Sequence, residues 1–175
     1  MLAFDHVVIA VESFESAAQA LRVTTGLEAR PGGRHAGHGT GNWIAPLGST
    51  YLELMSAVDA EEAAASVLGR AVLSAADRNA VFALCLRTDD ISAVADRLGL
   101  TAMAMSRVTP DGEELRWRLA GLENAMSDGL PFFIQWDTDV HPGAGGDVAG
   151  LMTWIEVGAD PATLDAWLGE SSLDI

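Results

Sequence analysis

The sequence has little cysteine, few basic residues and no long apolar run. Its single cysteine, Cys85, cannot form a disulfide within the chain, and its place in an apolar strand-like run favours core packing over nucleophilic chemistry. No run approaches the roughly 20 apolar residues that span a bilayer. The first residues also lack the basic and apolar regions of a secretory signal. We therefore expect a cytoplasmic protein that crosses no membrane.

Basic residues are scarce relative to acidic ones. The chain has 175 residues, of which 10 are Lys or Arg and 25 are Asp or Glu, so its formal net charge is −15. A polyanion would be repelled at long range by this charge, which argues against nucleic acid and anionic membrane as partners. The acidic residues are spread along the chain, as in a solubilising surface. A small molecule is the partner that we expect.

One strand-helix pattern occurs twice in the chain and begins a third time. An apolar run at residues 4–11 with a helical pattern at 14–21 returns as residues 81–86 and 91–98, and a weaker echo appears at 151–157 and 161–168. The first copy continues with a glycine-rich stretch at 30–41 and strand-like runs at 42–47 and 50–56. The second continues with strand-like runs at 101–108, 114–120 and 131–136. Both copies therefore have the order βαβββ.

This order predicts an α+β fold with a clear division of the chain. Residues 1–58 form the first βαβββ module, 59–79 a connecting helix, 80–140 the second module, and 147–175 a C-terminal βα extension or partial third module. Ser13 and Gly26 are placed to cap the two ends of the first helix. Glycine at 30–41 lets the backbone come close to another group. Duplicated units of this kind commonly share a concavity that binds a small molecule.

Glu53 is the acidic residue that most needs a partner. It shares one face of its strand with Tyr51 and Met55, while Leu52 and Leu54 occupy the other. A carboxylate in such apolar surroundings is costly unless it is paired, hydrogen-bonded or bound to metal. Glu53 is therefore a candidate catalytic base or ligand, or the hydrogen-bond partner of a core histidine.

Five motifs occur in a fixed order between residues 4 and 137, and together they resemble a known family. They are Asp5-His6-Val7-Val8-Ile9-Ala10-Val11, Gly32-Gly33-Arg34-His35 with Gly39-Thr40-Gly41-Asn42, Tyr51-Leu52-Glu53-Leu54, Leu115-Arg116-Trp117-Arg118, and Pro131-Phe132-Phe133-Ile134-Gln135-Trp136. This set is similar to the vicinal oxygen chelate superfamily of glyoxalases, bleomycin resistance proteins and dioxygenases, and more narrowly to its glyoxalase-like domain branch. The resemblance implies two modules with curved mixed sheets around a cleft.

The resemblance also implies a divalent metal held by residues from the first and last strand of each module. The matching positions here are His6, Glu53, Ala83 and Gln135, and alanine cannot ligate. His38, or His35 three residues before it, would then complete a site with His6 and Glu53. Imidazole and carboxylate ligands suit zinc, iron, manganese or nickel. In the alternative, no metal binds and His6 is a core histidine bonded to Glu53.

Asn42, Arg116, Gln135 and Trp117 are the candidate substrate-binding residues. Arginines at 116 and 118 share a strand face and suit a carboxylate or phosphate, or they pair with Glu113 or Glu114 at the surface. The resemblance implies a lyase, isomerase or dioxygenase that works in the cleft between modules, within one chain or in a homodimer. The alternatives are a metal-free binding or sequestering protein and, less favoured, an interaction module that uses the C-terminal extension.

Overall fold

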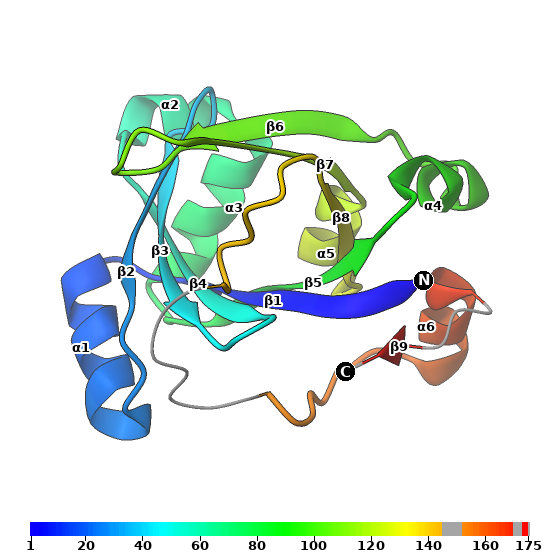
Figure 1. Ribbon diagram of the computed structural model, residues 1–175, viewed down its shortest axis with the longest axis horizontal. Helices are drawn as coiled ribbons and strands as arrows, with labels where there is room; N and C mark the ends of the chain where they lie inside the picture. Colours follow the sequence, from blue (N-terminus) through cyan, green and yellow to red (C-terminus); the bar gives the residue numbers. More distant parts are fainter. Residues whose placement is uncertain (145–151, 170–172, 175) are drawn as a thin grey trace.

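Two βαβββ modules build one curved mixed sheet in this α+β protein (Figure 1). The computed structural model describes residues 1–144, 152–169 and 173–174. The first module contains β1 (Leu2–Ala10), α1 (Phe14–Thr25), β2 (Arg30–His35), β3 (Thr40–Pro46) and β4 (Tyr51–Ala57). The second contains β5 (Val81–Thr88), α4 (Ile91–Leu98), β6 (Met103–Val108), β7 (Glu114–Ala120), α5 (Leu122–Asp128) and β8 (Phe132–Trp136). Helices α2 (Ala60–Ala65) and α3 (Val67–Ala76) connect them, and α6 (Pro161–Leu168) and β9 (Leu173–Asp174) follow.

The strands close into a barrel. Their order is β4-β3-β2-β6-β7-β8-β5-β1-β9, and β1 also pairs with β4, so the first eight strands form a ring. Within each module the first and last strands are parallel, whereas β1 and β5 meet antiparallel across the two modules. The second junction between modules is much shorter, because β2 and β6 pair only through Arg34↔Val108 and His35↔Arg107.

Local sequence signals explain where the first elements begin and end. The Ser13 side chain accepts a hydrogen bond from the Ser16 amide, and Gly26 ends α1 in the left-handed conformation, as predicted. The structure has two helices in the connecting segment, where one was predicted over residues 59–79. Ser66 adopts an extended conformation there, ending α2 and capping α3 through its hydroxyl group, which accepts from the Gly69 amide.

Apolar side chains of the strands pack with those of α3 and α5 in one interior cluster, and α4 and α6 pack on the outside of the barrel. The interior cluster includes Val8, Cys85, Trp117 and Ile134, so Cys85 has the core position expected of it. A second cluster packs between the outer face of β1, β5 and β8 and the helices α4 and α6. The trace of residues 137–144, gold in Figure 1, crosses one end of the barrel.

The C-terminal extension has the predicted helix but lacks the predicted strand in its described part. Helix α6 forms over Pro161–Leu168, but residues 152–157 are not a strand, and Leu151 with the rest of 147–151 lies outside the described residues. Met152 and Ile155 instead pack on the outer apolar cluster. The edge of β1 that a new strand would need is occupied by β4 and β9. No helix in the described ranges has both the length and the apolar character needed to cross a membrane.

Candidate functional site

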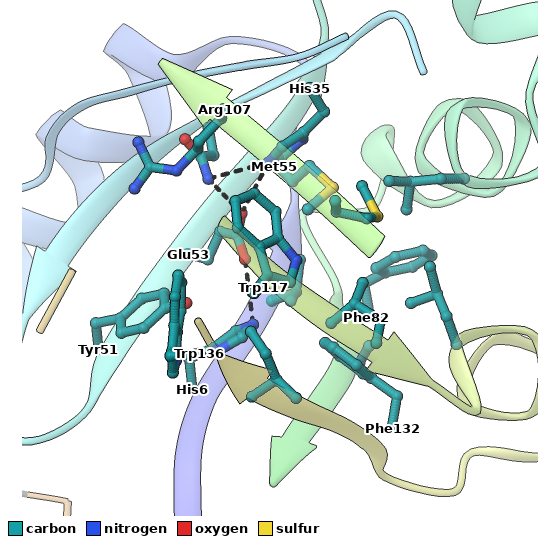
Figure 2. Close-up of a pocket in the computed structure, with 18 residues that line it drawn as sticks. His6, His35, Tyr51, Glu53, Met55, Phe82, Arg107, Trp117, Phe132 and Trp136 are labelled. Carbon is teal, nitrogen blue, oxygen red and sulfur yellow. Dashed lines mark hydrogen bonds and ion pairs between the residues drawn. The ribbon is translucent and has the colours of Figure 1, made fainter. Parts of the chain in front are cut away.

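The barrel encloses a cavity that is polar on one side and apolar on the other (Figure 2). Its volume is about 50 Å³, which is room for a few water molecules. The first module contributes most of the polar lining. Polar groups come from His6, His35, Asn42, Tyr51, Glu53 and Arg107, and the apolar wall is formed by Val8, Met55, Leu68, Phe82, Ala83, Met105, Leu119, Leu122, Phe132 and Ile134, with the indoles of Trp117 and Trp136.

Strand alternation brings the main polar residues to the cavity. On β4, Tyr51, Glu53 and Met55 all line it, as their spacing predicts. On β1, His6 lines it, and its ring stacks on that of Tyr51 with centroids 4.4 Å apart. His6 and Glu53 are only 3% and 5% exposed. Both groups therefore need internal partners.

Glu53 lies between two imidazoles. Its Oε2 is 3.3 Å from His6 Nε2, and its Oε1 is 3.9 Å from His35 Nε2. Asn42 completes the group, because its side-chain nitrogen donates to Glu53 Oε1 at 2.5 Å and lies 3.4 Å from His35 Nε2. The structure therefore brings His6, His35, Asn42 and Glu53 together from four strands.

In each histidine, the ring nitrogen Nδ1 lies within hydrogen-bond distance of a side-chain oxygen. His6 Nδ1 lies 2.6 Å from Asp5 Oδ1, and His35 Nδ1 lies 3.0 Å from the Thr40 hydroxyl. These contacts fix the two rings with Nε2 directed to Glu53. Metal-ligating histidines typically have such an oxygen partner at the other ring nitrogen.

Asp5 was not among the residues singled out from the sequence. In a regular strand it would face away from His6, but β1 has a register shift between Phe4 and His6 in its pairing with β5. Such a bulge redirects a side chain. Asp5 becomes fully buried, and its Oδ2 accepts from Trp136 Nε1 at 3.2 Å and lies 3.0 Å from His141 Nε2. Only the adjacency of Asp5 and His6 in the sequence hinted at this role.

The charges of the centre depend on these contacts. Burial opposes ionisation of Asp5 and Glu53, but hydrogen bonds and charge from neighbouring histidines outweigh it, so the pKa of Glu53 is lowered to about 2 and that of Asp5 is also lowered. Burial also lowers the pKa of His6, yet Cys85, Asp5 and Glu53 together raise it well above its ordinary value. For His35 burial dominates and lowers the pKa to about 4. Without a metal, the centre therefore holds two carboxylates, one imidazolium and one neutral imidazole.

His35, and not His38, reaches the centre. His35 is 4% exposed and lines the cavity, whereas His38 lies outside the lining residues, and its buried Nδ1 has no hydrogen-bond partner within the described chain. The reason is local. His35 is the last residue of β2 and still points inward, while His38 belongs to the turn that links β2 to β3.

Two of the predicted binding residues point elsewhere. Gln135 does not face Glu53, because its neighbour Ile134 points into the cavity and the Gln135 side-chain oxygen accepts from the Ile91 amide at the start of α4. Trp117 lines the cavity, so Arg116 lies on the outer face, where it pairs with Glu114 at 3.3 Å. Asn42 and Trp117 line the cavity as expected, as does Ala83.

Two groups of side chains are candidates for a metal. Ligand atoms of Asp5, His6 and Cys85 lie within 4.8 Å of one another, but His6 Nδ1 and Asp5 Oδ1 are already bonded to each other, and neither Asp5 nor Cys85 lines the cavity. His6, His35 and Glu53 fit a divalent metal better. Both imidazole nitrogens face the Glu53 carboxylate at the cavity, although ligand atoms of these three residues do not all lie within 4.8 Å of one another in the described chain, so a metal would draw them closer together.

Comparison with known proteins agrees with this architecture. A family model described as a glyoxalase-like domain matches residues 4–171. Among solved structures, the chain is similar to a hypothetical protein from Staphylococcus aureus, with 24% identity and a TM-score of 0.65 over 79% of this chain and 60% of that one. The chain therefore spans less than two thirds of that protein. No curated protein matches the sequence.

Two further similar structures are methylmalonyl-CoA epimerases. The enzyme from Mycobacterium tuberculosis is 19% identical, with a TM-score of 0.52 over 76% of this chain and 85% of that one. A variant of the Streptomyces coelicolor enzyme, in complex with 2-nitronate-propionyl-CoA, is 16% identical, with a TM-score of 0.56 over 78% and 97%. At these identities the likeness shows a shared fold.

Proposed function

Because the chain belongs to the glyoxalase-like domain family, we propose that it is a small-molecule enzyme whose reaction takes place in the barrel cavity, with a divalent metal held by His6, His35 and Glu53. The observation that carries the proposal is the arrangement of the two imidazoles. Both have Nδ1 beside an oxygen and Nε2 directed to the same carboxylate, at 3.3 and 3.9 Å. Two histidines and one carboxylate on one side of an otherwise open site suit iron, manganese, zinc or nickel.

A bound metal would supply Lewis-acid polarisation of a substrate oxygen. The protein's own residues do the remaining work. Asp5 fixes the His6 ring, and Tyr51 packs flat against it. Asn42 holds the Glu53 carboxylate in place by donating to Oε1. The apolar wall excludes water and so strengthens every charge interaction in the cavity.

The class of reaction follows from the same features. A polarised oxygen beside a fixed carboxylate favours proton transfer at the neighbouring carbon, which places isomerase or lyase chemistry ahead of dioxygenase chemistry. The similarity of fold to methylmalonyl-CoA epimerases supports this order. Glu53, the carboxylate that lines the cavity, would accept the proton and would also be a ligand of the bound metal.

Metal analysis of the purified protein tests the proposal. We expect one divalent metal per chain by elemental mass spectrometry, lost in His6→Ala and Glu53→Gln. Cys85→Ala is the matched control, because it removes a residue of the Asp5–His6–Cys85 group but not of the proposed site. A well-folded wild type without stoichiometric metal would contradict the proposal. Loss of metal in Cys85→Ala would place the metal at the other group.

A metal-free binding or sequestering protein is the second candidate. Ala83, Phe132 and Ile134 of the second module line the cavity with no ligand atom, so half of the wall suits an apolar molecule better than a chelate. This function requires a small molecule to bind with equal affinity before and after treatment with a chelator. The cytoplasmic location, the homodimer and the interaction role of the C-terminal extension stay predictions from the sequence.

A further inference from the structure

Arg107 is the buried cation that the proposed metal site does not use. It is 5% exposed and is the only arginine among the buried residues of the described chain. It lies on β6, opposite His35 in the short junction with β2, and Figure 2 shows its side chain at one edge of the lining residues. A buried guanidinium is costly unless its charge is paired.

No carboxylate in the described ranges lies within 4 Å of the Arg107 guanidinium. Its Nη1 donates to the Gly32 carbonyl oxygen, which leaves most of its five N–H groups for another acceptor. Two less buried arginines of the same sheet behave differently, since Arg34 pairs with Asp59 and Glu62, and Arg118 pairs with Asp137 at 2.9 Å.

The glycine pair of β2, Gly32 and Gly33, leaves space for the Arg107 side chain and for Asn42. A Cβ atom added at Gly33 would lie 3.2 Å from Arg107 Nη1 and 2.6 Å from the Val108 carbonyl oxygen. One added at Gly32 would lie 2.3 Å from Asn42 Oδ1. The close backbone approach expected of the glycine-rich stretch therefore makes room for Arg107 and for the centre beside it.

Arg107 also separates two spaces. It lines the cavity, and it lines an open groove of about 500 Å³ between β2, β3, β6, β7 and the segment 140–144. The cavity admits only the end of a molecule, whereas the groove has room for its body. Apolar side chains along the groove come from Pro31, Ile44, Pro110, Val140 and Pro142.

We infer that Arg107 is the substrate-recognition residue of this site, and that the substrate is a small organic acid which enters carboxylate first, with its apolar body in the groove. The inference rests on one part of the proposed function, namely that this cavity binds a substrate. A guanidinium binds a carboxylate through two parallel hydrogen bonds. The nearby Glu53 carboxylate disfavours a dianion, so a monocarboxylate fits better than a phosphate.

Calorimetric titration of the metal-free chain with phenylacetate, phenylacetamide and inorganic phosphate tests the inference. Because the chelator-treated protein is used, any preference for the acid comes from the chain and not from a metal. We expect phenylacetate to bind the wild type at least tenfold more tightly than phenylacetamide or phosphate. In Arg107→Met the ratio of acid to amide should fall to about one.

Arg116→Met is the matched control, because that arginine lies on the outer face and pairs with Glu114. It should keep the wild-type ratio. Arg107→Lys guards against loss of folding in Arg107→Met; it retains the charge but not the paired donors, and should lower the ratio several-fold. A wild type that binds neither probe or both equally, or an Arg107 variant that keeps the preference, overturns the inference. Absence of metal in the wild type overturns only the metal site.

Discussion

The two modules share one strand order but line the cavity in different ways. In the first, β1, β2, β3 and β4 bring His6, His35, Asn42 and Glu53 to one point. In the second, β5 and β8 bring Ala83, Phe132 and Ile134, and the helix α5 that interrupts this module adds Leu122. A duplicated scaffold has therefore kept its shape in both copies while polar residues gather in one.

This difference teaches what each copy contributes to the site. The first module holds charged groups in fixed positions through contacts among its own strands. The second closes the barrel and supplies an apolar wall, and its polar contributions are the supporting Trp136 and the boundary residue Arg107. The comparison predicts that polar substitutions in the first copy have larger effects than packing changes in the second.

The largest expected effect follows removal of Asp5 from the first module. Asp5→Ala leaves His6 Nδ1, Trp136 Nε1 and His141 without their buried partner, and breaking such a buried charge network costs about 3–5 kcal/mol. Urea denaturation should measure this loss. Asp59→Ala, which removes a half-exposed helix cap and one ion-pair partner of Arg34, should cost only about 1 kcal/mol. Equal losses in the two variants would show that the network contributes little.

The next effect is a pH dependence carried by His35. Its pKa is about 4 in the folded chain and about 6.5 when unfolded, so between these values the unfolded chain binds a proton that the folded chain does not. Stability should therefore fall as pH drops from 6.5 to 4, by about 3 kcal/mol in total.

Denaturation of the chelator-treated protein at pH 7, 6 and 5 measures this slope, with His35→Gln as the comparison. Above pH 5 the acidic residues of the centre are ionised in both states and His6 is protonated in the folded state, so the difference between the two proteins isolates His35. The same slope in His35→Gln would assign the pH dependence to another group.

A smaller loss of stability is expected from a substitution in the glycine pair of β2, next to the β2–β6 junction between the modules. Gly33 has φ +152°, and an added Cβ would meet the Val108 carbonyl oxygen at 2.6 Å, so Gly33→Ala requires the β2–β6 junction to shift. We expect a cost of about 2 kcal/mol. Gly37→Ala is the control, because that position also has positive φ but no atom within 4 Å of an added Cβ. Equal losses of stability in Gly33→Ala and Gly37→Ala would show that the β2–β6 junction is not tightly packed.

The smallest effect should come from the apolar wall of the second module. Ile134→Val removes one methylene group from the interior and should cost about 1 kcal/mol by urea denaturation. It should leave metal content unchanged, because Ile134 offers no ligand. Loss of metal in this variant would mean that the second module shapes the centre as well as enclosing it.

Much of the fold was predictable because local signals and alternation agree. The bounds of α4 and β7 match the prediction, and the inward face of Tyr51, Glu53 and Met55 follows from a period of two. The site was predictable in part. A bulge turns Asp5 toward His6, and alternation on β8 turns Gln135 away from Glu53 once Ile134 is known to face inward. Pattern alone shows neither the bulge nor the register.

For the same reason, the sequence alone could not show which of His35 and His38 lines the cavity. Both histidines lie in one glycine-rich stretch, and only the pairing of β2 with β3 and β6 decides which of them is still in a strand when it reaches the barrel interior. Arg107 was missed because its partner strand is over 70 residues away and only tertiary structure places it between the cavity and the groove.

Metal content of His35→Ala and His38→Ala, measured beside the wild type, tests most directly the claim that the working centre lies within the first module. The two substitutions remove the same group three residues apart, one inside the cavity and one outside its lining. We predict one metal per chain in the wild type and in His38→Ala, and less than a tenth of that in His35→Ala. Full metal content in His35→Ala, with loss in His38→Ala, would contradict the account.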